Sequence, residues 1–380
     1  MILCGNIIPA ATGGGGGATA GQLWAWGIGT SGNLGDNSIT SKSSPIQIGS
    51  LQTWSKISTA GENSTGNVSA SVKTDGTLWT WGAGDFGQLG DGTVISKSSP
   101  IQVGALTTWS LVSCGGYATV LSIKTDGTLW GWGRNGAGCI GDGSTTIRSS
   151  PVQVGALTNW SKITIGGGSS TNTHSHAVKT DGTLWSWGDS GSGRLGDGTL
   201  ADKSSPVQIG LLTTWADVDA GDGHCIALKT DGTIWTWGLA SSGQLGDGTA
   251  TSKSSPVQVG ALTTWAFISA GGNNTAAIKT DGTLWTWGAN NVGQMGDGTT
   301  TAKSSPVQIG ALTNWSKVYV GTGHTVAIKT DGTLWAWGSG SNGALGDGST
   351  VAKSSPVQVG ALTNWSIAAA GDSISFGIKS

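Results

Sequence analysis

Short runs of alternating apolar and polar residues recur along the whole chain at nearly constant spacing. The motif Trp-x-Trp-Gly begins at seven positions, Trp24, Trp79, Trp130, Trp185, Trp235, Trp285 and Trp335. The steps between copies are 55, 51, 55, 50, 50 and 50 residues, and another Trp follows the start of each motif after 30 residues. A period near 50 made of short apolar runs is typical of a radial repeat, in which each unit covers the apolar face of its neighbour.

One copy of the repeat predicts four β-strands. In the copy around Trp235 they are Thr233–Trp237, Val257–Gly260, Trp265–Ala270 and Ala276–Lys279. Each is a short alternating or apolar run bounded by turn residues. We place Pro256 at the start of its strand, where the missing N–H costs nothing. Asp281-Gly282 then turns the chain into the next copy. We predict a type I′ turn there, in which both central residues have positive φ.

Seven such copies with almost no helix predict an all-β fold, a seven-bladed β-propeller of four-stranded antiparallel blades. The two ends of the chain complement each other. The last residues lack the strand that should follow them, and Gly21–Gly27 lacks the strand that should precede it. We therefore expect N- and C-terminal strand pairing, Gly21–Gly27 with Phe376–Ser380, to close residues 21–380 into one ring without exposed edges.

The full repeat pattern resembles a known family. Gly-x-x-His-Thr-x-Ala-Ile-Lys-x-Asp-Gly-x-x-Trp-x-Trp-Gly, followed by Gly-x-Leu-Gly-Asp-Gly, is clearest from Gly321 to Gly348. It resembles the regulator-of-chromosome-condensation (RCC1) repeat, over about residues 21–380. The resemblance implies a seven-bladed propeller. It implies no single function, because this fold serves nucleotide exchange, ubiquitin-ligase modules, a secreted β-lactamase inhibitor and structural proteins. The near-identical copies resemble the bacterial and phage branch more than the eukaryotic exchange factors.

Charge and composition exclude several classes of function. The net charge is −2 and the 19 basic residues are spread evenly over the copies, which argues against nucleic-acid binding. The chain has no run of 18 apolar residues that would span a membrane, and its amino terminus does not read as a secretory signal. The four cysteines fall at unrelated positions of the repeat, so we expect no disulfide or metal framework.

The motifs that suggest chemistry have simpler interpretations. Gly82–Gly87 fits a dinucleotide fingerprint but opens no helix. Each Leu-Gly-Asp-Gly offers one carboxylate, too few for calcium, so we expect that Asp to close its own turn. His174 and His176 have no clustered Cys or carboxylate and make a poor zinc site. We predict a non-enzymatic protein with no catalytic residue, no metal and no cofactor.

The copies differ mainly on one rim. Length changes fall between the third and fourth predicted strands, that is, after the strand that begins at the later Trp of each copy, as insertions at Glu62–Asn67 and around Ser169–Thr173. The loop after Trp-x-Trp-Gly varies most in sequence. Both loops exit on the same side of an up-and-down blade. Variable loops on a rigid scaffold often bind partners, although neutral drift also explains them. The rim candidates for partner binding are Glu62, Asn63, Asn67, Asp85, Phe86, Arg134, Asn172, His174 and Arg194.

Residues 1–20 read as an attachment arm. The glycine run Gly13–Gly17 is a flexible tether, and the apolar residues before it suit contact with another subunit of an assembly. These candidates are Ile2, Leu3, Ile7 and Ile8. We favour a virion-associated phage decoration, tail or fibre protein that presents its rim to a host surface or protein ligand. The alternative is a cytoplasmic regulatory propeller that binds a soluble protein partner, as an exchange factor or inhibitor does.

Overall fold

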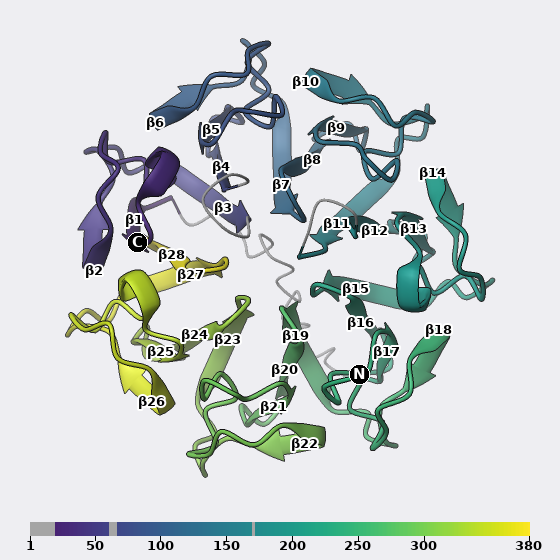
Figure 1. Ribbon diagram of the computed structural model, residues 1–380, viewed down its shortest axis with the longest axis vertical. Coiled ribbons are helices and arrows are strands. Elements are labelled where there is room, and N and C mark those ends of the chain that lie inside the picture. The colour runs from purple at the N-terminus through teal and green to yellow at the C-terminus, as the bar shows by residue number, and fades with distance from the viewer. Residues whose placement is uncertain (1–19, 61–66, 169–171) are drawn as a thin grey trace, which may run out of the picture.

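The computed structural model describes residues 20–60, 67–168 and 172–380, and these residues form seven four-stranded antiparallel sheets around a central axis (Figure 1). The predicted seven-bladed β-propeller is confirmed. In each blade the innermost strand begins at the Trp that follows the motif Trp-x-Trp-Gly. These strands are β3 (Trp54–Ala60), β7 (Trp109–Gly115), β11 (Trp160–Gly166), β15 (Trp215–Ala220), β19 (Trp265–Gly271), β23 (Trp315–Val320) and β27 (Trp365–Ala370).

In six blades the other three strands follow outward in sequence order, and the closing blade takes its third and outer strands from the start of the chain. The second strands are β4 (Val68–Lys73), β8 (Thr119–Lys124), β12 (His174–Lys179), β16 (His224–Lys229), β20 (Asn274–Lys279), β24 (His324–Lys329) and β28 (Ile374–Lys379). The third strands, which carry Trp-x-Trp-Gly, are β5 (Leu78–Gly82), β9 (Leu129–Gly133), β13 (Leu184–Gly188), β17 (Ile234–Gly238), β21 (Leu284–Gly288), β25 (Leu334–Gly338) and β1 (Gln22–Gly27). The outer strands are β6 (Lys97–Gln102), β10 (Arg148–Gln153), β14 (Lys203–Gln208), β18 (Lys253–Gln258), β22 (Lys303–Gln308), β26 (Lys353–Gln358) and β2 (Lys42–Gln47).

The described residues contain three short 3₁₀ helices, all in the loops that follow third strands. They are η1 (Thr30–Gly32), η2 (Gly191–Gly193) and η3 (Ser341–Gly343). The same part of the chain has no helix long and apolar enough to cross a membrane.

The ring closes through its two ends. β1 pairs antiparallel with β28, from Gln22 opposite Lys379 to Gly27 opposite Ile374, and the closing sheet has the order β2-β1-β28-β27. The predicted terminal pairing is confirmed, and β28 begins two residues before the predicted start at Phe376. The last blade therefore takes two strands from each end of the chain.

Two local predictions are corrected. The outer strand β18 begins at Lys253 and not at Val257, so Pro256 lies inside it, next to a register shift where the ladder with β17 is interrupted. An outer strand tolerates Pro there because that N–H has no partner to lose. The sequence around Lys253 is polar, so it lacks the alternation that marks a half-buried strand.

The type I′ turn is also wrong. Of Asp281 and Gly282, only the glycine has a positive φ, of 78°. The Gly282 N–H donates to the carbonyl of Lys279 at 2.9 Å, and the Lys279 N–H donates to that of Thr283 at 3.0 Å. This is a three-residue loop, a type I turn followed by a glycine bulge. The Asp281 carboxylate accepts bonds from the Thr283 N–H and hydroxyl, at 2.9 and 2.7 Å, which fixes the turn.

The core lies between the blades and is built from tryptophans. The second Trp of each motif is fully buried, and its indole N–H donates to a backbone carbonyl of the preceding blade, as Trp287 does to Gln244 at 2.9 Å. In six blades the Trp that begins the inner strand packs edge-on against both motif tryptophans, as Trp265 does with Trp285 and Trp287 at ring distances of 6.1 and 6.3 Å. In the seventh blade Trp215 packs against Trp235, and Trp237 packs against His176 of the preceding blade. Each buried Trp removes about 150–250 Å² from water, so these contacts hold neighbouring blades together.

Candidate interaction face and channel mouth

The propeller has two faces of different character. The loop face carries the connections from inner to second strands and the long loops after third strands. Backbone hydrogen bonds join the two kinds of loop, from Ala83 N–H to Asn67 O at 2.8 Å and from Asp189 N–H to Thr173 O at 2.9 Å. The prediction that both variable loops share one rim is therefore confirmed. The opposite, turn face carries the Asp-Gly hairpins.

The turn face repeats one arrangement around the ring. At the end of β16, Lys229 Nζ lies 3.8 Å from the ring centroid of Trp235 and 4.9 Å from that of Trp215. Burial lowers the pKa of Lys229, and Asp231 opposes that shift. In every copy a half-exposed leucine lies three residues before the Trp that begins the inner strand: Leu51, Leu106, Leu157, Leu212, Leu262, Leu312 and Leu362. This face presents nearly the same surface in each blade.

The Leu-Gly-Asp-Gly aspartates close their own turns, as predicted. Asp247 Oδ1 accepts hydrogen bonds from the Thr249 N–H at 2.9 Å and hydroxyl at 2.8 Å, and its Oδ2 lies 3.6 Å from Lys253 Nζ. Burial acts to raise the pKa of Asp247, but Thr249 and Lys253 outweigh it and hold the pKa below its usual value. Each of these carboxylates is engaged locally, and five pair with the first residue of an outer strand.

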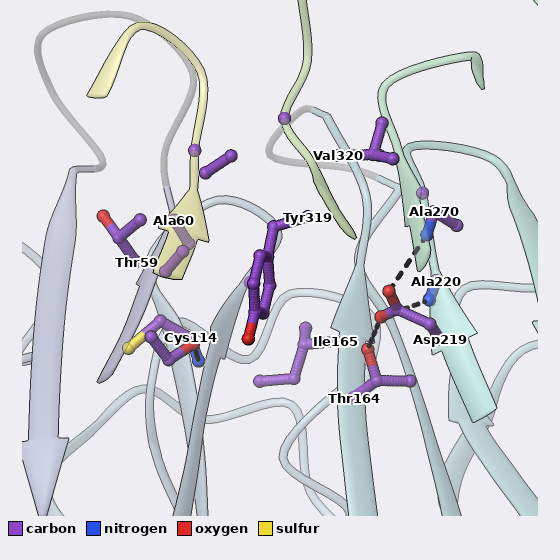
Figure 2. A pocket seen from close by; sticks show the side chains of 18 of the residues that line it. Thr59, Ala60, Cys114, Thr164, Ile165, Asp219, Ala220, Ala270, Tyr319 and Val320 are labelled. Carbon is purple, nitrogen blue, oxygen red and sulfur yellow. Dashed lines mark hydrogen bonds between the residues drawn. The ribbon is translucent and has the colours of Figure 1, made fainter. Parts of the chain in front are cut away.

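The central channel opens on the loop face as a shallow mouth lined by the ends of the seven inner strands (Figure 2). Its free volume is about 140 Å³, below the roughly 300–1,000 Å³ of small-molecule sites. The lining includes Asp219, Asp222 and Asp372, and no described lining residue is Lys or Arg. The mouth is therefore acidic and suits a contact with a larger partner better than enclosure of a cofactor.

Asp219 is fixed in that mouth by three neighbouring strands. Its Oδ1 accepts hydrogen bonds from the Thr164 hydroxyl at 2.9 Å and the Ala220 N–H at 3.0 Å, and its Oδ2 accepts one from the Ala270 N–H at 2.9 Å (Figure 2). Burial raises the pKa of Asp219, against these hydrogen bonds. The carboxylate links adjacent blades at the edge of the channel.

Deeper in the channel, charged residues replace apolar ones at one level of the inner strands. Asp217 is fully buried, and burial raises its pKa to about 7 although Lys162 opposes the shift. Burial and then the nearby charges of Lys162 and Lys317 lower the pKa of Lys56. Sequence reasoning missed this level, although Lys, Asp and apolar residues alternate there from copy to copy.

Two rim candidates from adjacent blades meet. Phe86 follows β5 and Arg134 follows β9, and Tyr117, between β7 and β8, completes the group. The Phe86 and Tyr117 rings are 5.5 Å apart, edge to face. The Arg134 guanidinium carbon lies 4.9 Å from the Phe86 centroid and 5.1 Å from that of Tyr117. All three side chains are partly exposed, and Asp85 beside them is exposed. We call these four residues the rim patch.

The comparisons with known proteins agree with this architecture. Residues 169–380 match the RCC1-like domain, and residues 20–65, 75–122 and 126–171 match the regulator of chromosome condensation (RCC1) repeat. The chain belongs to the RCC1-like propeller family. Among solved structures, it is similar to human WBSCR16, with a TM-score of 0.83 at 21% identity over 95% of this chain and 99% of that one. Prp20p from Saccharomyces cerevisiae, studied for its binding to Gsp1p and histones, gives 0.80 at 19% identity over 95% and 92%. At these identities the two structures support the fold alone.

Curated relatives of this RCC1-like propeller are larger proteins. The chain is 30% identical over 217 residues to the human E3 ubiquitin-protein ligase HERC2, a match of 55% of this chain and 4% of HERC2. It is 32% identical over 213 residues to the ultraviolet-B receptor UVR8 of Arabidopsis thaliana, a match of 54% of this chain and 45% of UVR8. The chain thus spans less than half the length of these relatives.

The remaining rim candidates of the RCC1-like ring lie in different places. Asn172 is partly exposed, and its carbonyl accepts a bond from Arg194 Nη1 at 2.9 Å. Asn67, His174 and Arg194 are buried, so as contact residues they are corrected: they pack the loop face from below and present almost no surface. Two rim candidates and all the arm candidates lie outside the described residues: Glu62, Asn63, Ile2, Leu3, Ile7 and Ile8.

One premise about His174 and His176 is wrong. No cysteine lies near them in the sequence, but the ring stacks β16 against β12 and brings Cys225 Sγ to 2.9 Å from His176 Nε2. The two residues are 49 positions apart in the chain. The signal in the repeat is that Cys225 occupies the position of Thr275, which contacts His224 of the preceding blade.

Proposed function

We propose that this protein is a non-enzymatic regulatory propeller that binds a soluble protein partner through its loop face. The observation that carries the proposal is the rim patch of Asp85, Phe86, Tyr117 and Arg134. Aromatic residues and Arg are enriched where protein interfaces gain most of their energy. A partly exposed aromatic pair with a stacked guanidinium is a pre-organised contact of that kind.

The patch is also specific to one place on the ring. At the position of Phe86, other copies have small residues such as Ser192 and Ser242. The position of Tyr117 holds Thr322 in one copy, and that of Arg134 holds Ser339. Three departures from the repeat therefore meet at one junction between blades. Loops that drift independently would scatter such departures around the ring.

The test exchanges the patch for residues of other copies. A chain carrying F86S, Y117T and R134S should fold like the parent, because each new residue occupies the equivalent position elsewhere in the ring. We expect affinity for a cross-linked and identified partner to fall by more than about tenfold, the loss that truncated hot-spot residues cause. The matched control replaces Leu157, Leu262 and Leu312 on the turn face with Ser and should bind as the parent does. Unchanged binding by the patch variant would count against the proposal.

A second candidate function is attachment within a larger assembly, such as a phage virion. It is supported by the near-identical copies of the repeat and by the sequence of residues 1–20, with apolar residues ahead of a glycine tether. Deleting residues 1–20 separates the two candidates. Binding of a soluble partner through the rim patch should survive the deletion, whereas incorporation into a particle should be lost. The first outcome favours a cytoplasmic regulator, and the second favours a virion component.

A further inference from the structure

Three buried side chains from neighbouring blades converge on one point between β12 and β16. His174 Nδ1 lies 3.0 Å from His176 Nε2. Cys225 Sγ lies 2.9 Å from His176 Nε2 and 3.7 Å from His174 Nδ1. All three residues are fully buried. Imidazole nitrogen and thiolate sulfur are the ligands that soft and borderline metal ions prefer.

The other blades show what a histidine does at the position of His174. His224 Nε2 lies 2.8 Å from the Thr275 hydroxyl of the next blade, which donates to the Gln244 carbonyl at 2.9 Å. His324 makes the same kind of contact with a serine hydroxyl at 2.7 Å. In these junctions the histidine is a hydrogen-bonded latch between blades.

The junction at His174 departs from that pattern twice. Cys225 stands where the latch partner is a hydroxyl residue, as Thr275 is. His176 stands at a core position that is apolar in the other blades: Ala70, Leu121, Ile226, Ala276, Val326 and Phe376. As a result, two atoms that can bind metal, Cys225 Sγ and His176 Nε2, lie side by side. Together with His174 they make a two-histidine, one-cysteine set.

The geometry of the set admits a metal ion. The three separations place the centre of the triangle about 1.9 Å from each ligand atom, and opening the two shorter separations by about 0.5–0.9 Å gives the ~2.0–2.1 Å and ~2.3 Å typical of metal–nitrogen and metal–sulfur bonds. The two imidazole rings meet at 80°, so they approach the point from different directions.

The surroundings orient His174. Its other ring nitrogen, Nε2, faces the backbone near Gly166 and Gly221, where a Cβ on Gly166 would come 2.6 Å from Nε2 and 2.3 Å from the Gly221 carbonyl oxygen. Metal-bound histidines commonly place their remaining N–H against a backbone carbonyl. A proton on Nε2 beside Gly221 leaves Nδ1 free toward Cys225 and His176.

We infer that His174, His176 and Cys225 form a buried three-coordinate site for cuprous copper. Binding exchanges the thiol proton, which leaves to solvent, for Cu⁺, so a thiolate and a monovalent cation leave the site neutral. Zn²⁺ bound to one thiolate would leave a net positive charge in the interior, and burying an unpaired charge costs free energy. Zn²⁺ also favours a fourth ligand. Among the described residues no further His, Cys, Asp or Glu joins the set.

The test measures Cu⁺ binding by the full chain with Cys4 replaced by Ser, which removes one competing thiol. Cu⁺ is kept reduced with ascorbate without oxygen, supplied both during refolding and to folded protein, and competed with bicinchoninate. We expect one retained Cu⁺ per chain, and X-ray absorption should show two nitrogen ligands and one sulfur ligand. C225T and H176V should each lower the affinity for Cu⁺ by more than about 100-fold. That loss exceeds the one expected when a residue that only hydrogen-bonds to a metal ligand is removed.

The controls separate the site from its alternatives. C225T and H176V introduce residues that other blades hold at these positions, so both variants should fold, and either one alone carries the test. C114A removes a different buried thiol and H324N alters an ordinary latch, and both should retain Cu⁺ fully. A parallel titration with Zn²⁺ against a zinc chelator identifies the ion. Failure to retain Cu⁺, equal retention by C225T and H176V, or retention of Zn²⁺ in place of Cu⁺ would overturn the inference.

Discussion

The position of a residue in the repeat decides its chemistry. Asp247 lies in a surface turn, where hydrogen bonds and Lys253 favour its ionised form. Asp217 has the same side chain but lies inside the channel wall, where its Oδ1 accepts the Val218 N–H at 2.9 Å and its Oδ2 has no hydrogen-bond partner among the described residues. The two carboxyl groups should therefore affect stability in opposite directions as pH changes.

Asp217→Asn should stabilise the fold at high pH. The folded pKa of Asp217 is about 7, above the unfolded value of 3.8, so the unfolded chain loses this proton first as pH rises. The stabilisation that Asp217 contributes to the folded state is therefore complete only below the unfolded pKa, and it is lost as pH rises through the folded pKa of about 7. Asn keeps the acceptor for Val218 without the charge. We expect urea unfolding at pH 8 to show a gain of up to about 4 kcal/mol over the parent, falling to about 1 kcal/mol at pH 4.5 and to almost none at pH 3.

Asp247→Asn is the matched control with the opposite sign. Its folded pKa is lowered, so its stabilisation is present above about pH 4 and is lost as pH falls through the folded pKa. This variant should be less stable than the parent at pH 8, and the two should converge in acid. If both variants followed the pH profile of the parent, the assignment of charge to these two sites would be wrong.

Loops and strands are joined by close backbone packing at defined glycines. Gly246 has a φ of 71°, and a Cβ there would lie 2.7 Å from the Trp287 indole nitrogen. Gly260 has a similar φ of 62°, but a Cβ there would meet nothing within 4 Å. The two glycines therefore separate backbone strain from steric exclusion.

Gly260→Ala should cost about 1 kcal/mol, the strain of a left-handed residue with a Cβ. Gly246→Ala should cost the same strain plus about 1–3 kcal/mol for pushing Trp287 away from its bond to Gln244. Denaturant midpoints of the two variants measure the difference. Equal losses would show that the indole has room to move, and that the seam between blades is not closely packed there.

The strands were predictable where one face is buried. Trp265–Ala270 and Thr233–Trp237 alternate or carry Trp, and both predictions lie within a residue of the structure. The outer strand was predicted four residues late, because its Lys-Ser-Ser start has no buried face to impose a pattern. The Asp-Gly turn was misassigned because the side chain of Asp281, and not the dipeptide alone, determines the loop.

The candidate sites were less predictable than the fold because they form between blades. Cys225 meets His174 across 51 positions of sequence, and Tyr117 meets Phe86 from a neighbouring blade. The sequence showed that these residues depart from the repeat, but not that their positions face each other. Variation alone also placed buried residues such as His174 and Arg194 on the rim, because sequence variability does not report exposure.

The whole ring depends on the strand pair that closes it. Residues 376–379 pair with Gln22–Ala25, and the fully buried Phe376 packs edge-on against Trp81 of the next blade at 5.8 Å. Removing residues 376–380 deletes this ladder, opens two strand edges and leaves a cavity beside Trp81. An open edge and a missing core aromatic each favour aggregation or unfolding.

We therefore expect the chain truncated after residue 375 to lose solubility and to melt more than about 5 °C below the parent, since loss of a buried Phe alone costs about 3–5 kcal/mol. Removing residues 1–19 is the control, because it leaves every strand of the closing sheet in place. That variant should melt as the parent does. If the truncation at residue 375 also melted like the parent, neighbouring blades would hold the ring without terminal pairing. Stability would then reside in the contacts between blades, and closure would serve only to cover edges.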